Sequence, residues 1–440
     1  MSMLMDDNLP NRPVQRLMAP VLRFMHIQAA GGLVLFCCTV VALLAANSPL
    51  ASWYHAFWNQ SLGLTFGDSS MSYPLWYWVN DALMVIFFFV IGLEIKRELT
   101  TGELSEKHKI ILPAAAAIGG AVTPAIIFLM IQQDQPGQNG WAIPMATDIA
   151  FVVGAISLLG KRVPHSLKIF LLSVAIVDDL LAVLVIAVFY TESIQWSWMI
   201  LSVGGFGAII LLNRLGVRAI SVYVAVACGI WLAVHNAGIH PTIAGVILGL
   251  MTPSRSLMNW NAVQTAFTSL GSAFSQADIH TVNSGTVKMS RVAQFTARES
   301  ISPLDRLEKG LHPWVAFAIM PLFALANAAV SFQDTNLGDS LSMAIIVGLV
   351  VGKPLGILVT AYAVVSFRWT KLPKNINWPV MAGAGILSGV GFTMSLFIAS
   401  LGLEGSSLEI AKGGVLVGSA VSILLGCGIL LITLRTKQPS

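Results

Sequence analysis

The chain is built from long apolar runs separated by shorter polar segments. Runs of about 20 residues with almost no charge recur twelve times between Ile27 and Leu434. Runs of this length predict helices that cross a bilayer, because in lipid every backbone polar group must be hydrogen-bonded within its own segment. We therefore predict an all-α membrane protein with twelve transmembrane helices.

Basic residues are distributed unevenly among the polar segments. If the N-terminus is cytoplasmic, 23 of the 25 Lys and Arg residues fall on the cytoplasmic side, Lys412 falls outside, and Lys353 lies within a helix. Positive residues near the ends of spans collect on the cytoplasmic side. The charge pattern therefore predicts a multi-pass protein with both termini cytoplasmic, and it supports an even number of helices independently of hydropathy.

Composition excludes other classes of protein. Of the 440 residues, 56% are hydrophobic and 10% are charged, whereas soluble domains carry about 25% charged residues. The net charge of +4 follows from the predicted topology, so we expect no nucleic-acid partner. The four cysteines lie inside apolar runs, without the spacing of a metal site or a disulfide framework.

Two segments outside the apolar runs stand out. Residues Leu62 to Ser72 alternate apolar and polar positions around Gly67-Asp68, which predicts a β-hairpin on the outer face. Residues 253–313 are polar and rich in Ser and Thr, and we assign them to a long cytoplasmic loop. Loops of that length are usually functional or disordered, and the sequence leaves both open.

The predicted helices contain a topological repeat. Helices three to five and helices ten to twelve form two triplets of opposite orientation, and the middle member of each contains helix breakers. Helix four has Pro144 shortly before Thr147-Asp148, and helix eleven has four glycines between Gly383 and Gly391. Discontinuous helices at matching positions of two inverted repeats indicate a binding site at the membrane midplane, although glycines also serve close helix packing.

We therefore predict a single integral membrane domain over residues 1–440. Its core bundle covers about 110–190 and 341–434, and the remaining helices form an interface or dimer bundle.

Four charged residues are predicted to lie inside the membrane: Asp148, Asp178, Asp179 and Lys353. On insertion scales each costs roughly 2.5–3.5 kcal/mol. One Asp–Lys pair could serve helix packing alone, but three carboxylates against one lysine exceed what structure requires. We therefore favour a functional site over a structural ion pair.

The ligand type indicates the chemistry. Carboxylate and hydroxyl oxygens suit hard cations such as Na⁺ and Li⁺, and a carboxylate buried in a low dielectric can also hold a proton. Competition of Na⁺ and H⁺ for one site couples their fluxes. Asp178 and Asp179 point about 100° apart on a helix, so one can face the ion while the other pairs with Lys353. Asp148 and Lys353 also lie beside the helix breakers, where charges compensate half-helix dipoles.

Five motifs carry a resemblance to a known family. They are GLEIKRE (Gly92–Glu98), ATDIAF (Ala146–Phe151), VDDL (Val177–Leu180), GKPLG (Gly352–Gly356) and GFTMSLFIASL (Gly391–Leu401). Together they resemble the NhaA-type Na⁺/H⁺ antiporters, with every motif in the expected order. This family is a standard example of inverted repeats with broken helices, so the repeat found above agrees with the resemblance without being an independent test of it.

The resemblance implies roles for the buried residues. Asp179 would be the principal Na⁺ and H⁺ ligand. Asp178 would share in binding the cation and the proton, and it would pair with Lys353. Lys353 would compensate the negative charge and serve as a proton carrier. Thr147 and Asp148 would lie where the two broken helices cross, with Thr147 as a neutral oxygen ligand. No cofactor is implied.

The resemblance also implies a transport activity, a cellular location and an oligomeric state. Members of the family export cytoplasmic sodium or lithium electrogenically in exchange for external protons, are activated at alkaline pH, and reside in the bacterial inner membrane. The hairpin at 62–72 would join two copies in a homodimer.

A charged rim is the last implied feature, formed by Glu94, Arg97, Glu98, Glu308 and His312. By resemblance it senses pH, although Lys309 stands where some relatives have a histidine. An interfacial ion-pair network without a sensing role explains these charges equally well.

Other classes of protein fit the sequence less well. An intramembrane aspartyl protease needs aspartates on two facing helices, whereas the neighbouring pair here lies on one helix, so we do not expect an enzyme. Cation channels use rings of charge or carbonyl filters rather than one Asp–Lys group. A sodium-coupled symporter for an organic solute would share the broken helices and is the stronger rival.

Overall fold

The computed structural model describes residues 30–66, 69–102, 105–191, 194–217, 220–256, 260–276, 284–331 and 336–435. Both chain termini, predicted to be cytoplasmic, lie outside these residues. The chain divides into two compact units. The first contains residues 1–80, 111–182 and 316–440, and the second contains 81–110 and 183–315.

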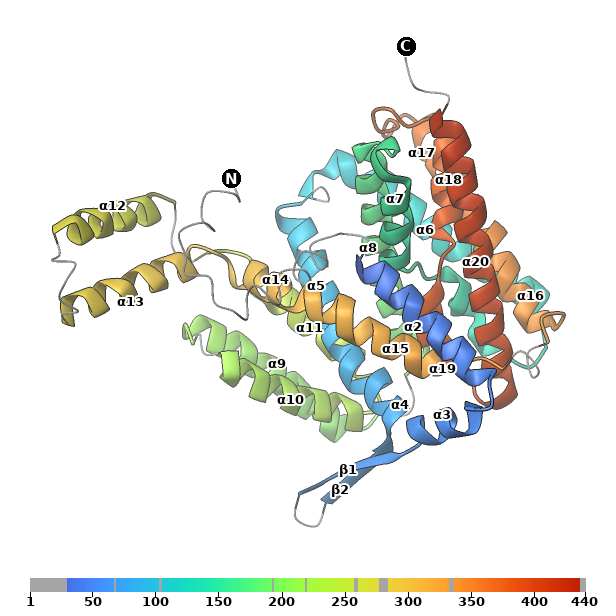
Figure 1. Cartoon of the computed structure of the whole chain (residues 1–440), viewed down its shortest axis with the longest axis horizontal. Helices are drawn as coiled ribbons and strands as arrows, with labels where there is room; N and C mark the ends of the chain where they lie inside the picture. The colour runs from blue at the N-terminus through green and yellow to red at the C-terminus, as the bar shows by residue number, and fades with distance from the viewer. Residues whose placement is uncertain are drawn as a thin grey trace. The chain divides into compact units, whose positions relative to one another are not determined.

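The first unit holds most of the long apolar helices (Figure 1). In chain order its elements are α2 (Ala30–Ala46), α3 (Ala51–Trp58), β1 (Ser61–Phe66), β2 (Ser69–Pro74), α4 (Leu75–Trp78), most of α6 (Lys107–Ile131), η3 (Gln138–Met145), α7 (Ile149–Leu159), η4 (Gly160–Arg162), most of α8 (His165–Phe189), α15 (Met320–Asn327), α16 (Ser340–Val347), η6 (Gly348–Gly352), α17 (Lys353–Ser366), α18 (Trp378–Ser388), α19 (Phe392–Gly402) and α20 (Gly405–Arg435).

The second unit contains α5 and the segment that follows α8. Its elements are α5 (Met84–Thr100), α9 (Trp196–Arg214), α10 (Ile220–Asn236), α11 (Thr242–Met251), α12 (Trp260–Gln276), α13 (Ser284–Glu299) and α14 (Pro303–Trp314). The π-helical segments η1 (Val79–Leu83) and η5 (Val315–Ile319) connect parts of the chain that belong to different units.

Local capping explains where several helices begin. Ser302 accepts a hydrogen bond from the Asp305 N–H at 3.1 Å and is followed by Pro303, so α14 starts eleven residues before the apolar run that begins at Trp314. Asp339 and Asn377 cap α16 and α18 in the same way, accepting from Leu341 N–H at 2.9 Å and Val380 N–H at 3.1 Å. Residues 253–313, predicted to form a loop, thus contain the helices α12 and α13 and all of α14 except its last residue.

In the described part of the chain, eight helices are long and apolar enough to cross a membrane. The number rises to ten if two bent pairs each count as one span: α2 with α3, bent by 116°, and α18 with α19, bent by 44°. The apolar helices α10 and α11 are shorter. An all-helical membrane protein is confirmed, and the count of twelve stays a prediction.

The predicted hairpin is confirmed as a structural element, and its location on the outer face stays a prediction. Strands β1 and β2 pair antiparallel, with Leu62 opposite Tyr73 and Gly63 opposite Ser72. The turn at Gly67-Asp68 lies outside the described residues.

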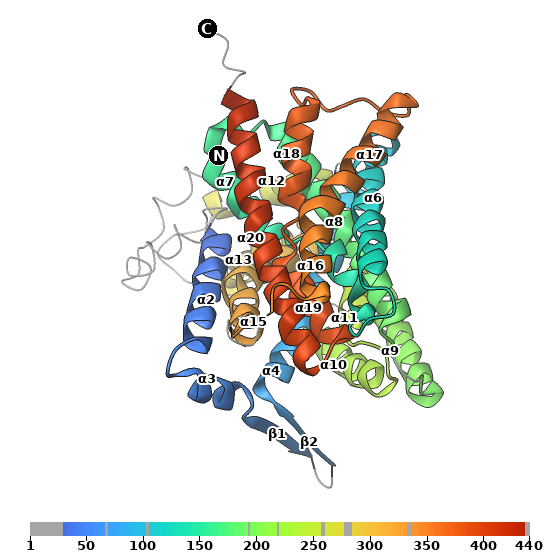
Figure 2. The same cartoon turned by 90° about the vertical axis from the view of Figure 1, so that its right-hand side faces the viewer.

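Close helix packing surrounds the middle of the first unit. Helices α16 and α18 both pack against α20 (Figure 2). Helix α17 approaches α6 so closely that a Cβ added to Gly356 would lie 2.0 Å from the Gly119 carbonyl oxygen. Only glycine allows this approach, which holds the start of α17, and with it Lys353, against α6.

Candidate ion site

Two helical interruptions face each other in the first unit. After η3, residues Ala146 and Asp148 are extended, with ψ of 151° and 103°, before α7 begins. The Asp148 N–H donates to Val390 O at 2.7 Å, and the Thr147 hydroxyl donates to Ser388 O at 3.0 Å. Polar groups at the first interruption are therefore hydrogen-bonded to carbonyl groups at the break between α18 and α19. Such pairing is required where irregular backbone is buried.

Asp148 bridges the N-termini of two short helices. Its Oδ1 accepts from Phe151 N–H in the first turn of α7 at 3.1 Å. Its Oδ2 accepts from Thr393 N–H in the first turn of α19 at 3.1 Å and from the Thr393 hydroxyl. A carboxylate is favoured at the positive end of a helix dipole. Asp148 therefore compensates both helix ends, in the role that its place beside Pro144 predicted.

Asp178 forms a buried ion pair with Lys353. Asp178 Oδ2 lies 2.6 Å from Lys353 Nζ and accepts a hydrogen bond of 2.6 Å from the Thr147 hydroxyl. Neither side chain of the ion pair is exposed to solvent. Asp178 Oδ1 is buried and has no hydrogen-bond partner among the described residues. Asp178 thus joins α8 to the extended link before α7 and to α17.

Lys353 also bonds to the interrupted backbone. It follows the π-helical segment η6, and its Nζ donates to the carbonyl oxygen of Met145, the last residue of η3. A cation is favoured at the C-terminal end of a helical segment. The one lysine of this site therefore compensates both a carboxylate and a helix end.

Asp179 is buried beside this group. It follows Asp178 on α8, is 2% exposed, and lies within electrostatic range of Lys353. Successive helical side chains diverge by about 100°, so Asp179 presents its carboxylate in a direction different from that of Asp178. The structure thus places the predicted residues Thr147, Asp148, Asp178, Asp179 and Lys353 in the first unit.

Sequence reasoning missed several polar groups of the site. Thr393 bonds to Asp148, and the Met145 carbonyl accepts from Lys353. The carbonyl groups of Ser388 and Val390 accept hydrogen bonds from Thr147 and Asp148 in the opposite interruption. Ser395 donates to Ile143 O at 2.7 Å. Thr393 and Ser395 lie within the quoted GFTMS string. Their position directly after the glycines was the available signal, but carbonyl groups have no signature in side-chain patterns.

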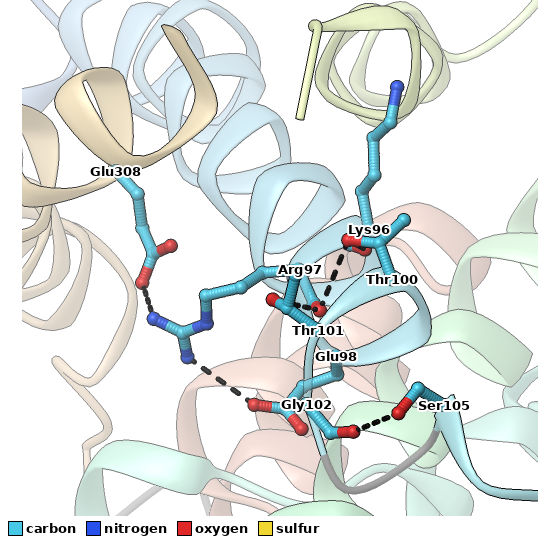
Figure 3. Close-up of polar contacts among 8 residues, drawn as sticks. All are labelled: Lys96, Arg97, Glu98, Thr100, Thr101, Gly102, Ser105 and Glu308. Carbon is cyan, nitrogen blue, oxygen red and sulfur yellow. Dashed lines mark hydrogen bonds and ion pairs between the residues drawn. The ribbon is translucent and has the colours of Figure 1, made fainter. Parts of the chain in front are cut away.

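The predicted rim residues come together in the second unit. Figure 3 shows the Arg97 guanidinium between two carboxylates: it pairs with Glu308 on α14, and its Nη2 lies 3.5 Å from Glu98 Oε1. Glu94 interacts electrostatically with Arg97, Glu98 and Glu308. His312 interacts with Arg97 as well. Helices α5 and α14 therefore carry one charge network, whose role in pH sensing stays a prediction.

The site offers hard oxygen ligands, the type that small cations and protons bind. Among the described residues, no group of three or more His, Cys, Asp or Glu side chains is placed to hold a metal ion. The buried oxygens of the site come from two neighbouring carboxylates, a hydroxyl and backbone carbonyls, which are hard ligands.

The fold and the site define a membrane protein with ionisable groups at an interruption of its helices, as ion transporters have. A model of the family described as Na⁺/H⁺ antiporter 1 matches residues 22–430. The chain belongs to this antiporter family and is a multi-pass bacterial membrane protein.

Individual relatives match over almost their whole length. The Na⁺/H⁺ antiporter NhaA of Rhodopirellula baltica is 49% identical over 97% of each chain. NhaA 2 of Vibrio vulnificus is 43% identical over 95% of this chain and 93% of its own. NhaA of Rhizobium meliloti is 43% identical over 98% of each chain.

Proposed function

We propose that this protein exports cytoplasmic Na⁺ or Li⁺ in electrogenic exchange for external protons. The observation that carries the proposal is the burial of Asp178 and Asp179 beside a single lysine, at a point where two interrupted helices face each other. A purely structural ion pair would need one carboxylate. The second carboxylate supplies a site that can be neutralised either by a proton or by a metal cation.

Competition for that site couples the two fluxes. Asp179 is the principal ligand, and Asp178 and Thr147 supply further oxygens. With a proton bound, the carboxylate attracts Na⁺ weakly, and with Na⁺ bound it releases its proton. Lys353 compensates the negative charge of Asp178 while the cation is absent, and it also carries a proton. The Asp178–Lys353 contact of 2.6 Å supports this role, because a cation arriving at Asp178 weakens that pairing.

The interrupted helices provide the moving part in our proposal. We infer twelve transmembrane helices, of which the third to fifth and the tenth to twelfth form two inverted triplets, with η3–α7 and α18–α19 as the discontinuous fourth and eleventh helices. The core bundle, about 110–190 and 341–434, moves the site between the two sides of the membrane, and the remaining helices hold the interface. Hydrogen bonds between the interruptions support this, because they join the two triplets at one point.

Alkaline activation is assigned to the rim. Glu94, Arg97, Glu98, Glu308 and His312 form one network, so a change of charge on one member is felt by the others. We place this rim at the cytoplasmic face of the inner membrane, where both termini also lie. The hairpin of β1 and β2 joins two copies in a homodimer.

The decisive experiment uses everted membrane vesicles that contain the protein. An imposed pH gradient is followed while Na⁺, Li⁺ or K⁺ is added at several alkaline pH values. We expect Na⁺ and Li⁺ to dissipate the gradient, K⁺ to have no effect, and Asp179→Asn to be inactive although it is inserted at normal levels. Normal coupled exchange by Asp179→Asn would overturn the assigned role.

The same vesicles distinguish the symporter alternative. If no cation acts at any pH, the antiporter assignment fails for this chain. Sodium uptake stimulated by an organic solute would then identify a symporter.

A further inference from the structure

The helices α12 and α13 form an amphipathic pair that the transport mechanism does not use. They pack against each other in the second unit, side by side (Figure 1). On α12, Val263 and Leu270 are buried, while Phe267 between them is 46% exposed. On α13, Val292 and Phe295 are 45% and 52% exposed. Two helices alone therefore leave part of their apolar stripes uncovered.

We propose that this pair lies on the membrane surface, with Phe267 and Phe295 inserted among anionic lipids. The tethering of the pair supports this. The pair follows α11, an apolar helix that ends at Met251, and precedes a candidate membrane span that begins at Pro303. Both ends of the pair are therefore joined by a few residues to segments that we place in the membrane. This tethering keeps the pair close to the bilayer surface.

Charge identifies the lipid as anionic. Helix α12 contains no charged residue, and on α13 Lys288, Arg291 and Arg298 outnumber Glu299. Arg291, Phe295 and Arg298 follow at intervals of four and three residues, so they line one side of α13, and all three are exposed. An exposed phenylalanine between two arginines suits the boundary between acyl chains and anionic headgroups.

The hydroxyl groups on the polar face of α12 are hydrogen-bonded within the helix. The hydroxyls of Thr265, Thr268 and Ser269 each donate to a carbonyl four residues earlier, at 2.8 to 2.9 Å. Thr39 and Thr433, within apolar helices, donate in the same way. Hydroxyl groups that are satisfied within their own helix cost little at the edge of a membrane, where their face of α12 points away from the lipid.

The base of the pair is fixed to α14. The Arg306 Nη1 lies 3.7 Å from Glu299 Oε1 at the end of α13, and Leu304 N–H donates to Pro253 O at 3.2 Å. These contacts hold both ends of the segment together. The pair is therefore positioned as a unit rather than as a loose loop.

Site-directed fluorescence on the full-length protein tests the proposal. In a variant with the four cysteines replaced by serine, single cysteines replace Phe267 or Phe295 and carry a bimane label. Ser272→Cys and Ala297→Cys are matched controls, because both positions are exposed and lie on the opposite sides of the same helices. Each protein is placed, one copy per disc, in nanodiscs of phosphatidylcholine with or without phosphatidylglycerol and nitroxide-labelled lipid.

We expect the nitroxide lipid to quench labels at positions 267 and 295, and not at 272 and 297, in discs that contain phosphatidylglycerol. Replacing Arg291 and Arg298 by Gln should weaken the apparent affinity for phosphatidylglycerol, obtained from how the quenching depends on its fraction in the disc, by about fivefold for each residue. Labels at 267 and 295 that stay open to aqueous iodide in these discs would overturn the proposal. If the labels are protected from iodide only in discs that hold two copies of the protein, the exposed apolar face contacts a second copy. That result would overturn the proposal as well.

Discussion

The Nζ atom of Lys353 lies 2.6 Å from the Oδ2 atom of Asp178, and neither side chain is exposed to solvent. The two residues are 175 positions apart in the chain and lie on the different helices α17 and α8. Removing one partner of a buried pair leaves an uncompensated charge, which costs more than removing both.

Lys353→Met is therefore expected to destabilise the protein by about 3–5 kcal/mol. The double variant Lys353→Met, Asp178→Asn should recover part of that loss, because no buried charge is left alone. The apparent midpoint of thermal unfolding of the purified variants measures both effects. Equal loss in the single and double variants would show that the lysine contributes through packing alone.

Thr393→Ala is expected to lower the free energy of unfolding by about 1.5–3 kcal/mol, the range for a hydrogen bond to a charged group. The lost hydroxyl leaves Asp148 with fewer donors at the N-terminus of α19. Thr393→Ser keeps the hydroxyl and should retain most of the stability. Thr39→Ala is the matched control, since among the described residues the buried Thr39 hydroxyl bonds only within α2, at 2.8 Å. A similar loss in Thr39→Ala would refute a special role for Thr393.

Arg97→Gln tests the rim. Without the guanidinium, ionisation of Glu308 costs more, so the pH at which exchange reaches half its maximum should move upward. Arg97→Lys keeps the charge and should shift the profile less. Rates of Na⁺-dependent proton release in everted vesicles between pH 6.5 and 9 supply the profile. A lowered stability with an unchanged profile would favour the ion-pair network without a sensing role.

His240 gives a second pH dependence, in stability rather than transport. Burial lowers the pKa of His240 to about 4, with the neighbouring His235 adding to the shift. Its Nδ1 lies 2.7 Å from the Thr242 hydroxyl and 3.5 Å from the Thr242 N–H, which can only donate, as suits a neutral ring. Between pH 6.5 and 4 the unfolded chain binds a proton that the folded chain does not, so stability falls as the pH falls through this window.

His240→Gln should remove that dependence, decreasing the stability lost between pH 7 and 5 by about 2 kcal/mol. Thermal unfolding of the two proteins at both pH values measures the difference. His55→Gln, at an exposed position, should behave like the unchanged protein. An identical acid response in His240→Gln would exclude this histidine as its source.

Several features of this protein could be predicted from the sequence because they depend on local pattern. The apolar runs predicted membrane helices because backbone groups in lipid must be satisfied within the segment. The alternation from Leu62 to Ser72 predicted the hairpin, since strand side chains have a period of two. The charges at 148, 178, 179 and 353 stood out because an ionisable residue in an apolar run is costly.

Helix boundaries outside the apolar runs, and the contacts between helices, could not be predicted from polarity and spacing. Polarity assigned residues 253–313 to a loop, yet α12, α13 and α14 lie there, because an amphipathic pattern and the Ser302 cap are enough to form helices outside an apolar run. Sequence spacing predicted that Asp178 and Asp179 diverge. That Asp178 takes both Thr147 and Lys353 as partners depends on which helices pack together.

The sequence by itself therefore determined the class of protein, the family and the residues that bear charge in the membrane. Only the tertiary structure decided that Asp148 caps α7 and α19 together, and that the carbonyls of Met145, Ser388 and Val390 serve the site. Carbonyl groups occur at every residue and are normally satisfied within a helix. They become available only where an interruption opens, and tertiary packing determines which groups meet there.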